Sequence, residues 1–258
     1  MIVGILMLGG GAAAGLFGSL LGLGGGILIV PLLTLGFGLP LREAVGVSLV
    51  SVIMTSSAAA GVYLEKHVAN LRLGMSLELF TAIGALVGGS VAFLLDERLL
   101  GILFSLLLVY IAVTMVRRRA EPEPQPTGEE GAPDGYVVRN MGKGVVGATF
   151  AGVVSALLGI GGGIIKVPLM NLTMGVPLRV ATATSNLMIG ITASASAVIY
   201  LLRGEIDPYV AGPTAIGVFL GATLGSRIAP RIDLRYLRVL FVVVLVYTAI
   251  QMLLKAIG

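Results

Sequence analysis

Two short glycine-rich segments are where the backbone of this chain could itself bind a ligand. They read Gly-Leu-Gly-Gly-Gly over 22–26 and Gly-Ile-Gly-Gly-Gly over 159–163, and an apolar segment follows each. Glycine permits positive φ and the close approach of other groups. The first amides of a helix lack intrahelical partners and, with the helix dipole, favour an anion. We therefore expect an anion site, or alternatively only close helix packing, at Gly24, Gly25, Gly26, Gly161, Gly162 and Gly163.

Lys166 follows the second of these segments by three residues and lies deep in apolar sequence. A lysine at the centre of a bilayer costs at least about 2.5–3.5 kcal/mol on insertion scales, so it should face a cavity or a partner. The nearest carboxyl group in the apolar sequence is Glu78, close to the start of its own segment. We therefore expect an uncompensated charge that attracts an anionic substrate; a lysine that snorkels or pairs structurally is the alternative.

Hydroxyl and amide side chains enter two later apolar segments, where they could orient the oxygens of an anion. Ser185 and Asn186 lie in the second half of the chain, and Ser48 occupies the position matching Ser185 in the first half. Hydrogen bonds between helices are the alternative use of these groups. No catalytic residue, metal site or cofactor is expected, since the chain has no cysteine and a single histidine.

The composition places these residues in a membrane protein. The chain of 258 residues is 57% hydrophobic and 12% charged, whereas soluble domains are about 45–50% apolar and about 25% charged. The basic residues behind the net charge of +4 lie mostly in short connections, which favours membrane topology over nucleic-acid binding. Apolar runs that approach the about 20 residues needed to cross a bilayer as helices cover 44–64, 73–95, 99–116, 183–202, 209–228 and 237–254.

The chain contains two tandem copies of one unit. Gly22 and Gly159 open the two glycine motifs 137 residues apart, and no gap is needed to align the rest. The same offset pairs Pro31 with Pro168, Arg42 with Arg179, Asp96 with Asp233, and Tyr110 with Tyr247. It also pairs Gly84 and Gly88 with Gly221 and Gly225, and this four-residue spacing of glycines predicts close helix packing, which we call packing seams. We expect repeats at 1–116 and 141–258, joined by a polar cytoplasmic linker over 117–140.

Each unit opens with an apolar stretch too long for one span. Residues 2–37 would run about 54 Å as one helix, whereas 27–37 alone would reach only about 17 Å. We therefore expect an all-α polytopic protein in which each unit is a re-entrant hairpin, hinged at the glycines, plus three transmembrane helices. A hairpin plus three helices crosses the membrane an odd number of times, so the second unit would be inverted relative to the first. Inversion puts 12 basic residues on one side of the membrane and 4 on the other. Cytoplasmic loops are enriched in lysine and arginine in this way. A broken full span, giving parallel repeats, is the alternative.

The sequence from Gly15 to Leu33, repeated from Gly152, resembles the TauE/SafE sulfite exporter family. The doubled Gly-x-Gly-Gly-Gly motif with its following Pro31 or Pro168 carries this resemblance, and it extends over both units. The resemblance implies a multi-pass transporter of sulfur-containing anions in the cell inner (plasma) membrane. Sulfite, thiosulfate and organosulfonates such as sulfoacetate are the substrates it implies.

We therefore expect a secondary transporter of small sulfur-containing anions that works by alternating access. An anion channel, or a carrier of another small organic anion, is the alternative. An intramembrane enzyme is disfavoured by the lack of cysteine, of clustered histidines and of a deep acid. The expected partners are the small anionic substrate and the lipid bilayer, with no nucleic acid, and a homodimer is left open.

Overall fold

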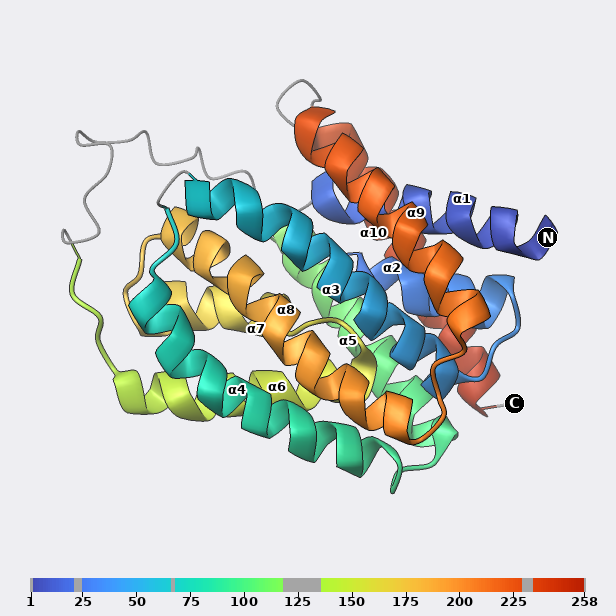
Figure 1. Cartoon of the computed structure of the whole chain (residues 1–258), viewed down its shortest axis with the longest axis horizontal. Coiled ribbons are helices and arrows are strands. Elements are labelled where there is room, and N and C mark those ends of the chain that lie inside the picture. The colour runs from blue at the N-terminus through green and yellow to red at the C-terminus, as the bar shows by residue number, and fades with distance from the viewer. Residues whose placement is uncertain (1, 21–24, 66–67, 118–135, 229–233, 258) are drawn as a thin grey trace.

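A computed structural model describes residues 2–20, 25–65, 68–117, 136–228 and 234–257 (Figure 1). The regular structure of these residues is helical, which confirms the predicted all-α class. The first half holds α1 (Ile2–Leu20), α2 (Gly26–Pro31), the π-helical turn η1 (Leu32–Gly36), α3 (Leu41–Glu65), α4 (Leu71–Ala92) and α5 (Glu97–Arg117). The second half holds α6 (Met141–Leu158), α7 (Gly163–Pro168), the π-helical turn η2 (Leu169–Thr173), α8 (Leu178–Leu202), α9 (Pro208–Ile228) and α10 (Leu234–Ile257).

Seven helices among the described residues are long and apolar enough to cross a membrane: α1, α3, α4, α5, α6, α8 and α10. Four of the six predicted apolar runs fall within them, and a fifth, 73–95, extends three residues past the end of α4. The sixth run, 209–228, forms the 21-residue helix α9, which is not among the seven. The chain is therefore a multi-pass membrane protein.

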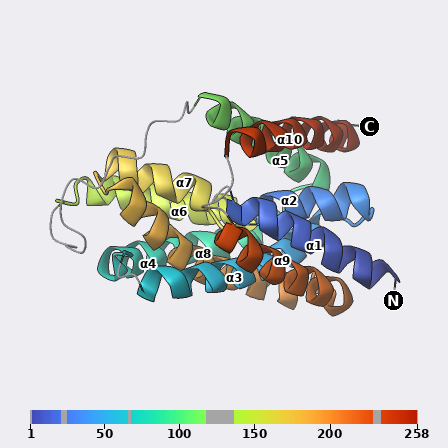
Figure 2. The ribbon, with the colours of Figure 1, turned by 90° about the horizontal axis from the view of Figure 1, so that it is seen from above.

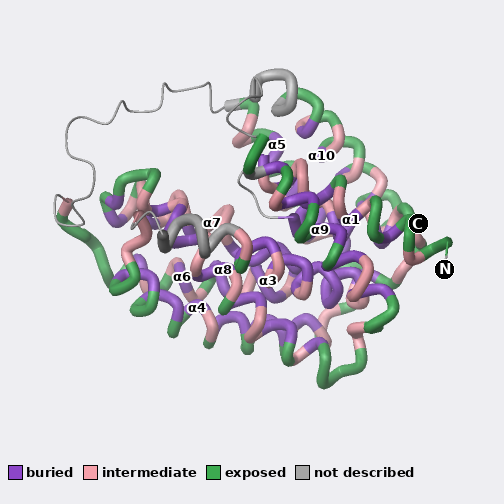
Figure 3. Tube along the Cα trace, turned by 45° about the horizontal axis from the view of Figure 1, so that its top comes forward, coloured by how far each residue is buried: buried purple, intermediate pink, exposed green. Residues whose placement is uncertain are grey.

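The outer surface of the bundle is apolar, and several polar side chains lie inside. Leu79, Leu106 and Val146 are exposed, whereas Glu78 and Lys166 are buried. A helical bundle in lipid has this distribution, because apolar side chains face the hydrocarbon and polar groups face other helices. Figure 3 shows buried residues concentrated along α3 and the helices beside it.

The long helices pack in pairs that correspond under the offset of 137 residues. Helix α1 lies along α9, and α6 lies along α4, while α3 packs against α8 at the centre (Figures 1 and 2). Helices α5 and α10 form a pair of their own, above α1 and α2 in the view of Figure 2.

Glycines form the contact between the helices of the two long pairs. A methyl group at Gly84 of α4 would overlap the carbonyl oxygen of Thr149 on α6, and one at Gly221 of α9 would overlap that of Ala12 on α1. Gly88 and Gly225 meet backbone on the same partner helices. Small residues allow backbones in a membrane to approach this closely, so the predicted packing seams are confirmed.

The two short helices fold back along the long helices that precede them. Leu32 of η1 reaches Gly10 of α1, and the backbone N–H of Arg139 donates to the carbonyl of Met174 at 3.0 Å. The bond between Arg139 and Met174 places the end of η2 beside the residues that precede α6. Each short α-helix has a proline as its last residue, Pro31 or Pro168, and continues as a π-helical turn. Proline has no N–H for an intrahelical bond, so a change of helix type at this point is expected.

Candidate functional site

The two glycine turns meet at the centre of the bundle. A β-carbon on Gly26 would lie 2.6 Å from the carbonyl oxygen of Gly159, so only glycine fits there. The Ser48 hydroxyl bridges the two turns, because it donates to the carbonyls of Gly159 at 2.7 Å and Gly26 at 3.2 Å. Gly25 has an ordinary helical φ of −65°, and Gly24 lies outside the described residues. Ser48, which the sequence suggested as a substrate-binding residue, thus forms hydrogen bonds to both halves of the chain.

The second glycine turn uses conformations that favour glycine. Gly159, Gly161 and Gly162 have φ angles of 70°, 79° and 75°, a region that side chains rarely allow. A β-carbon on Gly163, the first residue of α7, would lie 2.6 Å from the side chain of Ile189. Backbone geometry and close packing therefore account for these glycines, and anion binding by their amides stays a prediction.

Lys166 belongs to a closed ring of three buried side chains from three helices. Its ammonium on α7 lies 3.3 Å from Oε2 of Glu78 on α4 and donates to Oγ1 of Thr192 on α8 at 2.5 Å. The Thr192 hydroxyl in turn donates to Oε1 of Glu78 at 2.6 Å. Lys166 is 1% exposed and Glu78 is 3% exposed, so the ring is closed to solvent in this structure.

The expectation that Lys166 has an uncompensated charge is wrong, because Glu78 neutralises it. Glu78 lies about two turns into α4, and its side chain turns inward with those of Leu77 and Thr81, while Leu79 and Phe80 face outward. The sequence did place Lys166 correctly in the interior. The partner was missed because Glu78 was expected close to the start of its segment. The expected lack of a deep acid is therefore also wrong, since Glu78 is 3% exposed.

Two buried hydroxyl groups beside the second glycine turn have no hydrogen-bond partner among the described residues: Ser155 Oγ on α6 and Ser185 Oγ on α8. A β-carbon on Gly162 would lie 3.3 Å from that of Ser155 and 3.5 Å from Cε of Lys166. One on Gly163 would lie 3.6 Å from Ser185 Oγ. An unpaired buried hydroxyl costs about 1–3 kcal/mol, so such groups call for an explanation. Both hydroxyls are free to donate to a ligand held near Lys166.

The prediction from sequence included Ser185 but missed Ser155. Ser155 is an isolated polar residue in the apolar α6 segment, and nothing in its neighbourhood distinguishes it. Its burial and its place beside Gly162 appear only when α6 and α7 are packed together. Glu78 and Thr192 were missed for the same reason, since each becomes relevant only through contacts between helices.

Asn186 contacts its own helix and α3. Its side-chain amide donates to the carbonyl of Thr182 at 3.1 Å, and its backbone carbonyl accepts from the Ser56 hydroxyl of α3. The bond from Ser56 is the interhelical kind that the alternative interpretation predicts, whereas the Asn186 side chain itself bonds within α8. A role for Asn186 in orienting an anion stays a prediction.

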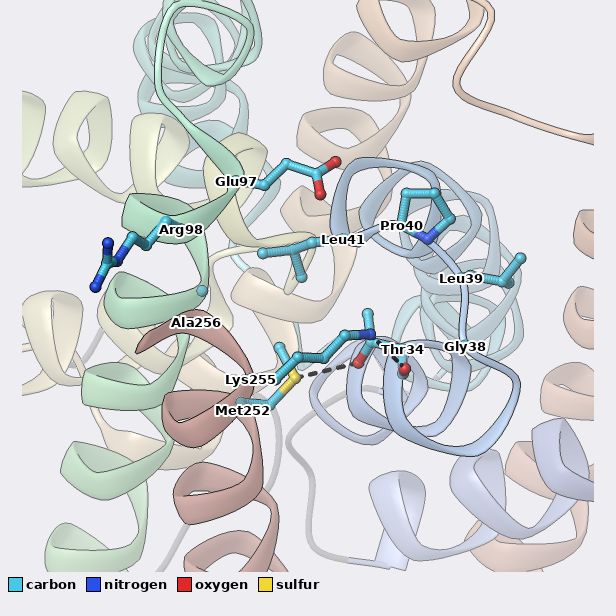
Figure 4. A pocket seen from close by; sticks show the side chains of 11 residues that line it. Thr34, Gly38, Leu39, Pro40, Leu41, Glu97, Arg98, Met252, Lys255 and Ala256 are labelled. Atoms are coloured by element: carbon cyan, nitrogen blue, oxygen red, sulfur yellow. Dashed lines mark hydrogen bonds between the residues drawn. The ribbon is translucent and has the colours of Figure 1, made fainter. Parts of the chain in front are cut away.

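A separate cavity of about 370 Å³ lies between η1, the start of α3 and the α5–α10 pair (Figure 4). Lys255 of α10 lines it and donates to the carbonyl of Thr34 at 2.9 Å, while the Thr34 hydroxyl contacts the sulfur of Met252 at 3.1 Å. Glu97 also lines the cavity, and Figure 4 shows Arg98 directed away from its other lining residues. These contacts join α10 to η1 and not to the Lys166 ring.

Apolar helices around buried charged and hydroxyl groups are typical of membrane proteins that move polar solutes. A family model described as sulfite exporter TauE/SafE matches residues 7–252. The chain belongs to this family of membrane transporters, which confirms the resemblance predicted from the glycine motifs.

Relatives in bacteria and plants extend the comparison. The chain is 26% identical over 262 residues to the probable membrane transporter protein YunE of Bacillus subtilis, covering 96% of each chain. It is 29% identical over 228 residues to a probable membrane transporter protein of Xylella fastidiosa, covering 88% of this chain and 85% of the relative. It is 30% identical over 150 residues to sulfite exporter TauE/SafE family protein 6 of Arabidopsis thaliana, covering 58% of this chain and 35% of the relative. No solved structure matches the chain significantly.

Proposed function

We propose that this protein is a secondary transporter of small sulfur-containing anions, acting by alternating access in the plasma membrane. Sulfite, thiosulfate and organosulfonates such as sulfoacetate are the substrate class. The family description supports the class of cargo. The observation that carries the proposal is the buried ammonium of Lys166 at a glycine turn, flanked by the unpartnered hydroxyls of Ser155 and Ser185.

The groups at this turn suit a small oxyanion. A sulfonate or sulfite group has oxygens on one sulfur atom that point in several directions. The Lys166 ammonium and the Ser155 and Ser185 hydroxyls come from three different helices, so they can donate to different oxygens. Hydrogen bonds from a charged donor are the strongest of these, so Lys166 supplies most of the affinity. Thr192 positions Lys166 through the hydrogen bond between them.

The proposed movement takes place between two inverted repeats, 1–116 and 141–258, joined by a cytoplasmic linker over 117–140. The corresponding helix pairs, α1 with α9 and α6 with α4, support this arrangement. The fold-back of α2 and α7 supports a re-entrant hairpin at the start of each unit. The ion pair joins Glu78 of the first unit to Lys166 of the second, so a movement of one unit against the other changes the site. Many transporters hold their substrate at such a repeat interface.

Counterflow in proteoliposomes tests the proposal. Vesicles preloaded with unlabelled sulfite, thiosulfate, sulfoacetate or taurine receive a trace of the labelled anion. The wild type is expected to show transient, saturable accumulation. Ser155→Ala and Ser185→Ala should each weaken apparent affinity about twofold to tenfold, the value of one hydrogen bond of about 0.5–1.5 kcal/mol. Neither should lower thermal stability, because neither hydroxyl has a partner to lose.

Lys166→Ile introduces the residue that stands at the matching position 29 and should weaken apparent affinity at least about tenfold, the value of a hydrogen bond from a charged donor. Lys143→Ile makes the same change at an exposed position of α6 and is the matched control. Folded wild type that accumulates none of these anions contradicts the assignment of sulfur-containing anions. Saturation-free flux without counterflow identifies a channel instead.

A further inference from the structure

We infer that Glu78 takes up a proton each time Lys166 binds an anion, so that the anion and H⁺ cross the membrane together in the same direction. The inference rests on the proposed role of Lys166 in binding the anion. It assigns the coupling ion and the residue that carries it, and its basis is the geometry of the Lys166–Glu78–Thr192 ring.

The ammonium of Lys166 is already occupied in this structure. It contacts Glu78 at 3.3 Å and Thr192 at 2.5 Å. Both charged side chains are almost fully buried, so the pair is not solvated from outside. An anion that binds the ammonium must therefore replace the Glu78 carboxylate as its counter-charge.

The replacement would leave a net charge in the interior if Glu78 stayed ionised. The pair is neutral without substrate, and a bound monoanion would give the group of three a charge of −1. An unpaired buried charge costs several kcal/mol. A proton on Glu78 restores neutrality, because the ammonium then faces the anion and the carboxyl group is uncharged.

No other described group on the surrounding helices can supply this compensation. Helices α6, α8 and η2 pack against α7, and α4 contributes Glu78. The remaining charged residues of these elements are Arg72 of α4, Lys143 of α6 and Arg179 of α8. All three are exposed near the first residue of their helix, whereas Lys166 is buried behind the glycine turn.

Thr192 can hold Glu78 in both protonation states. Its hydroxyl now donates to the ionised carboxylate at 2.6 Å. A hydroxyl is also an acceptor, so it can accept from the protonated carboxyl group once Lys166 has turned to the anion. The proton comes from water on the side where the anion enters and is released to water on the other side. One monoanion with one proton moves no net charge.

Isethionate is the best anion for the test, because its sulfonate carries a fixed single charge near neutral pH. Any proton that moves with it is carried by the protein, which is not true of sulfite. Proteoliposomes with the membrane potential held at zero receive labelled isethionate at an external pH one unit below the internal pH. Wild type should accumulate isethionate about tenfold, the ratio that one proton per anion gives for one pH unit, and an internal pH dye should report acidification.

Glu78→Gln keeps the shape of the side chain but cannot carry a proton. It should lose the accumulation driven by the pH gradient and the dye signal by more than it loses isethionate counterflow. Glu78→Asp keeps a carboxyl group and should keep the coupling, at a lower rate. Glu97→Gln makes the same change at an exposed residue of α5 and should behave as the wild type.

Three results overturn the inference. Wild type that catalyses counterflow but neither accumulates isethionate nor moves protons is not coupled to H⁺, and the proposed transport function then stands alone. A Glu78→Gln protein that still concentrates isethionate shows that another group carries the proton. Absence of counterflow for isethionate and for every other anion tested removes the proposed function and the coupling together. The first result does not depend on whether a variant folds.

Discussion

A single ion pair distinguishes the two halves of this molecule at the scale of residues. Lys166 corresponds to Ile29 under the offset of 137 residues, and Glu78 corresponds to Ala215. Both counterparts are buried apolar residues. The interior of one half is therefore packed without charge at the positions where the other half holds the pair, which suits a transporter with one substrate site.

This correspondence supplies a stability test. Lys166→Ile or Glu78→Ala alone leaves a buried charge without its partner and should lower the free energy of unfolding by about 3–5 kcal/mol. The double variant copies the residues of the other half, so it should lose less than the sum of the two single losses. Thermal unfolding in detergent measures all four proteins. Simple additivity would show that the two charges do not interact.

The sequence predicted the burial of a residue where its position along an apolar segment was enough to place it inside the membrane. Lys166 lies three residues beyond a glycine turn, so its burial followed from its position. Glu78 required the rotation of α4 about its axis. In a membrane protein the outward face is as apolar as the inward one, so hydrophobic periodicity cannot orient a helix as it does in soluble proteins. Contacts with α7 and α8 settle that orientation.

At the scale of elements, glycines determine which helices lie together. Gly15 of α1 faces the backbone of Val218 on α9, and a methyl group there would overlap its carbonyl oxygen. Gly9 lies on the same helix with no atom within 4 Å of an added β-carbon. The two positions therefore share a helix and a residue type but differ in their surroundings.

Gly15→Ala should lower the free energy of unfolding by about 1–3 kcal/mol, because the backbones of α1 and α9 must move apart. Gly9→Ala should be neutral or stabilising by up to about 1 kcal/mol, since alanine favours the helical state. Thermal unfolding of the purified proteins in detergent compares them. Equal effects of the two substitutions would contradict the packing role assigned to Gly15.

The apolar runs predicted most of the helices because length and hydropathy are properties of each segment alone. The short helices α2 and α7 followed from the glycines and from a segment too short to span the membrane. The run 209–228 forms a helix as predicted, but α9 is not among the seven helices of the described residues that are long and apolar enough to cross a membrane.

At the scale of the whole molecule, the α5–α10 pair covers the two π-helical turns η1 and η2 unequally. Thr34 of η1 is 2% exposed and contacts Met252 and Lys255 of α10. Asn171, its counterpart in η2, is partly exposed, and the neighbouring Leu172 is 79% exposed. Figure 2 shows α10 on the side of α1 and α2, away from α6 and α7. Unequal cover of η1 and η2 is what one state of the proposed alternating transporter would present.

In the other state, we expect η2 to be covered and η1 to be exposed. Met115 of α5 corresponds to Met252 of α10 under the offset of 137 residues, and Asn171 corresponds to Thr34. If the two units exchange their arrangements, Met115 of the first unit reaches Asn171 of the second unit when Met252 leaves Thr34. The sequence predicted two related units but not their asymmetry, because equal motifs cannot show which of two equivalent contacts is formed.

Cysteine cross-linking measures this exchange most directly, because the natural chain contains no cysteine. The pair Thr34→Cys and Met252→Cys replaces two side chains in contact and should cross-link under oxidation without substrate. The matched pair is Met115→Cys and Asn171→Cys, and the single-cysteine variants are controls. Alternating access predicts that substrate lowers the first cross-link and raises the second, and that either cross-link stops counterflow until it is reduced. A second pair that never cross-links, together with counterflow that continues while the first pair is locked, would contradict it.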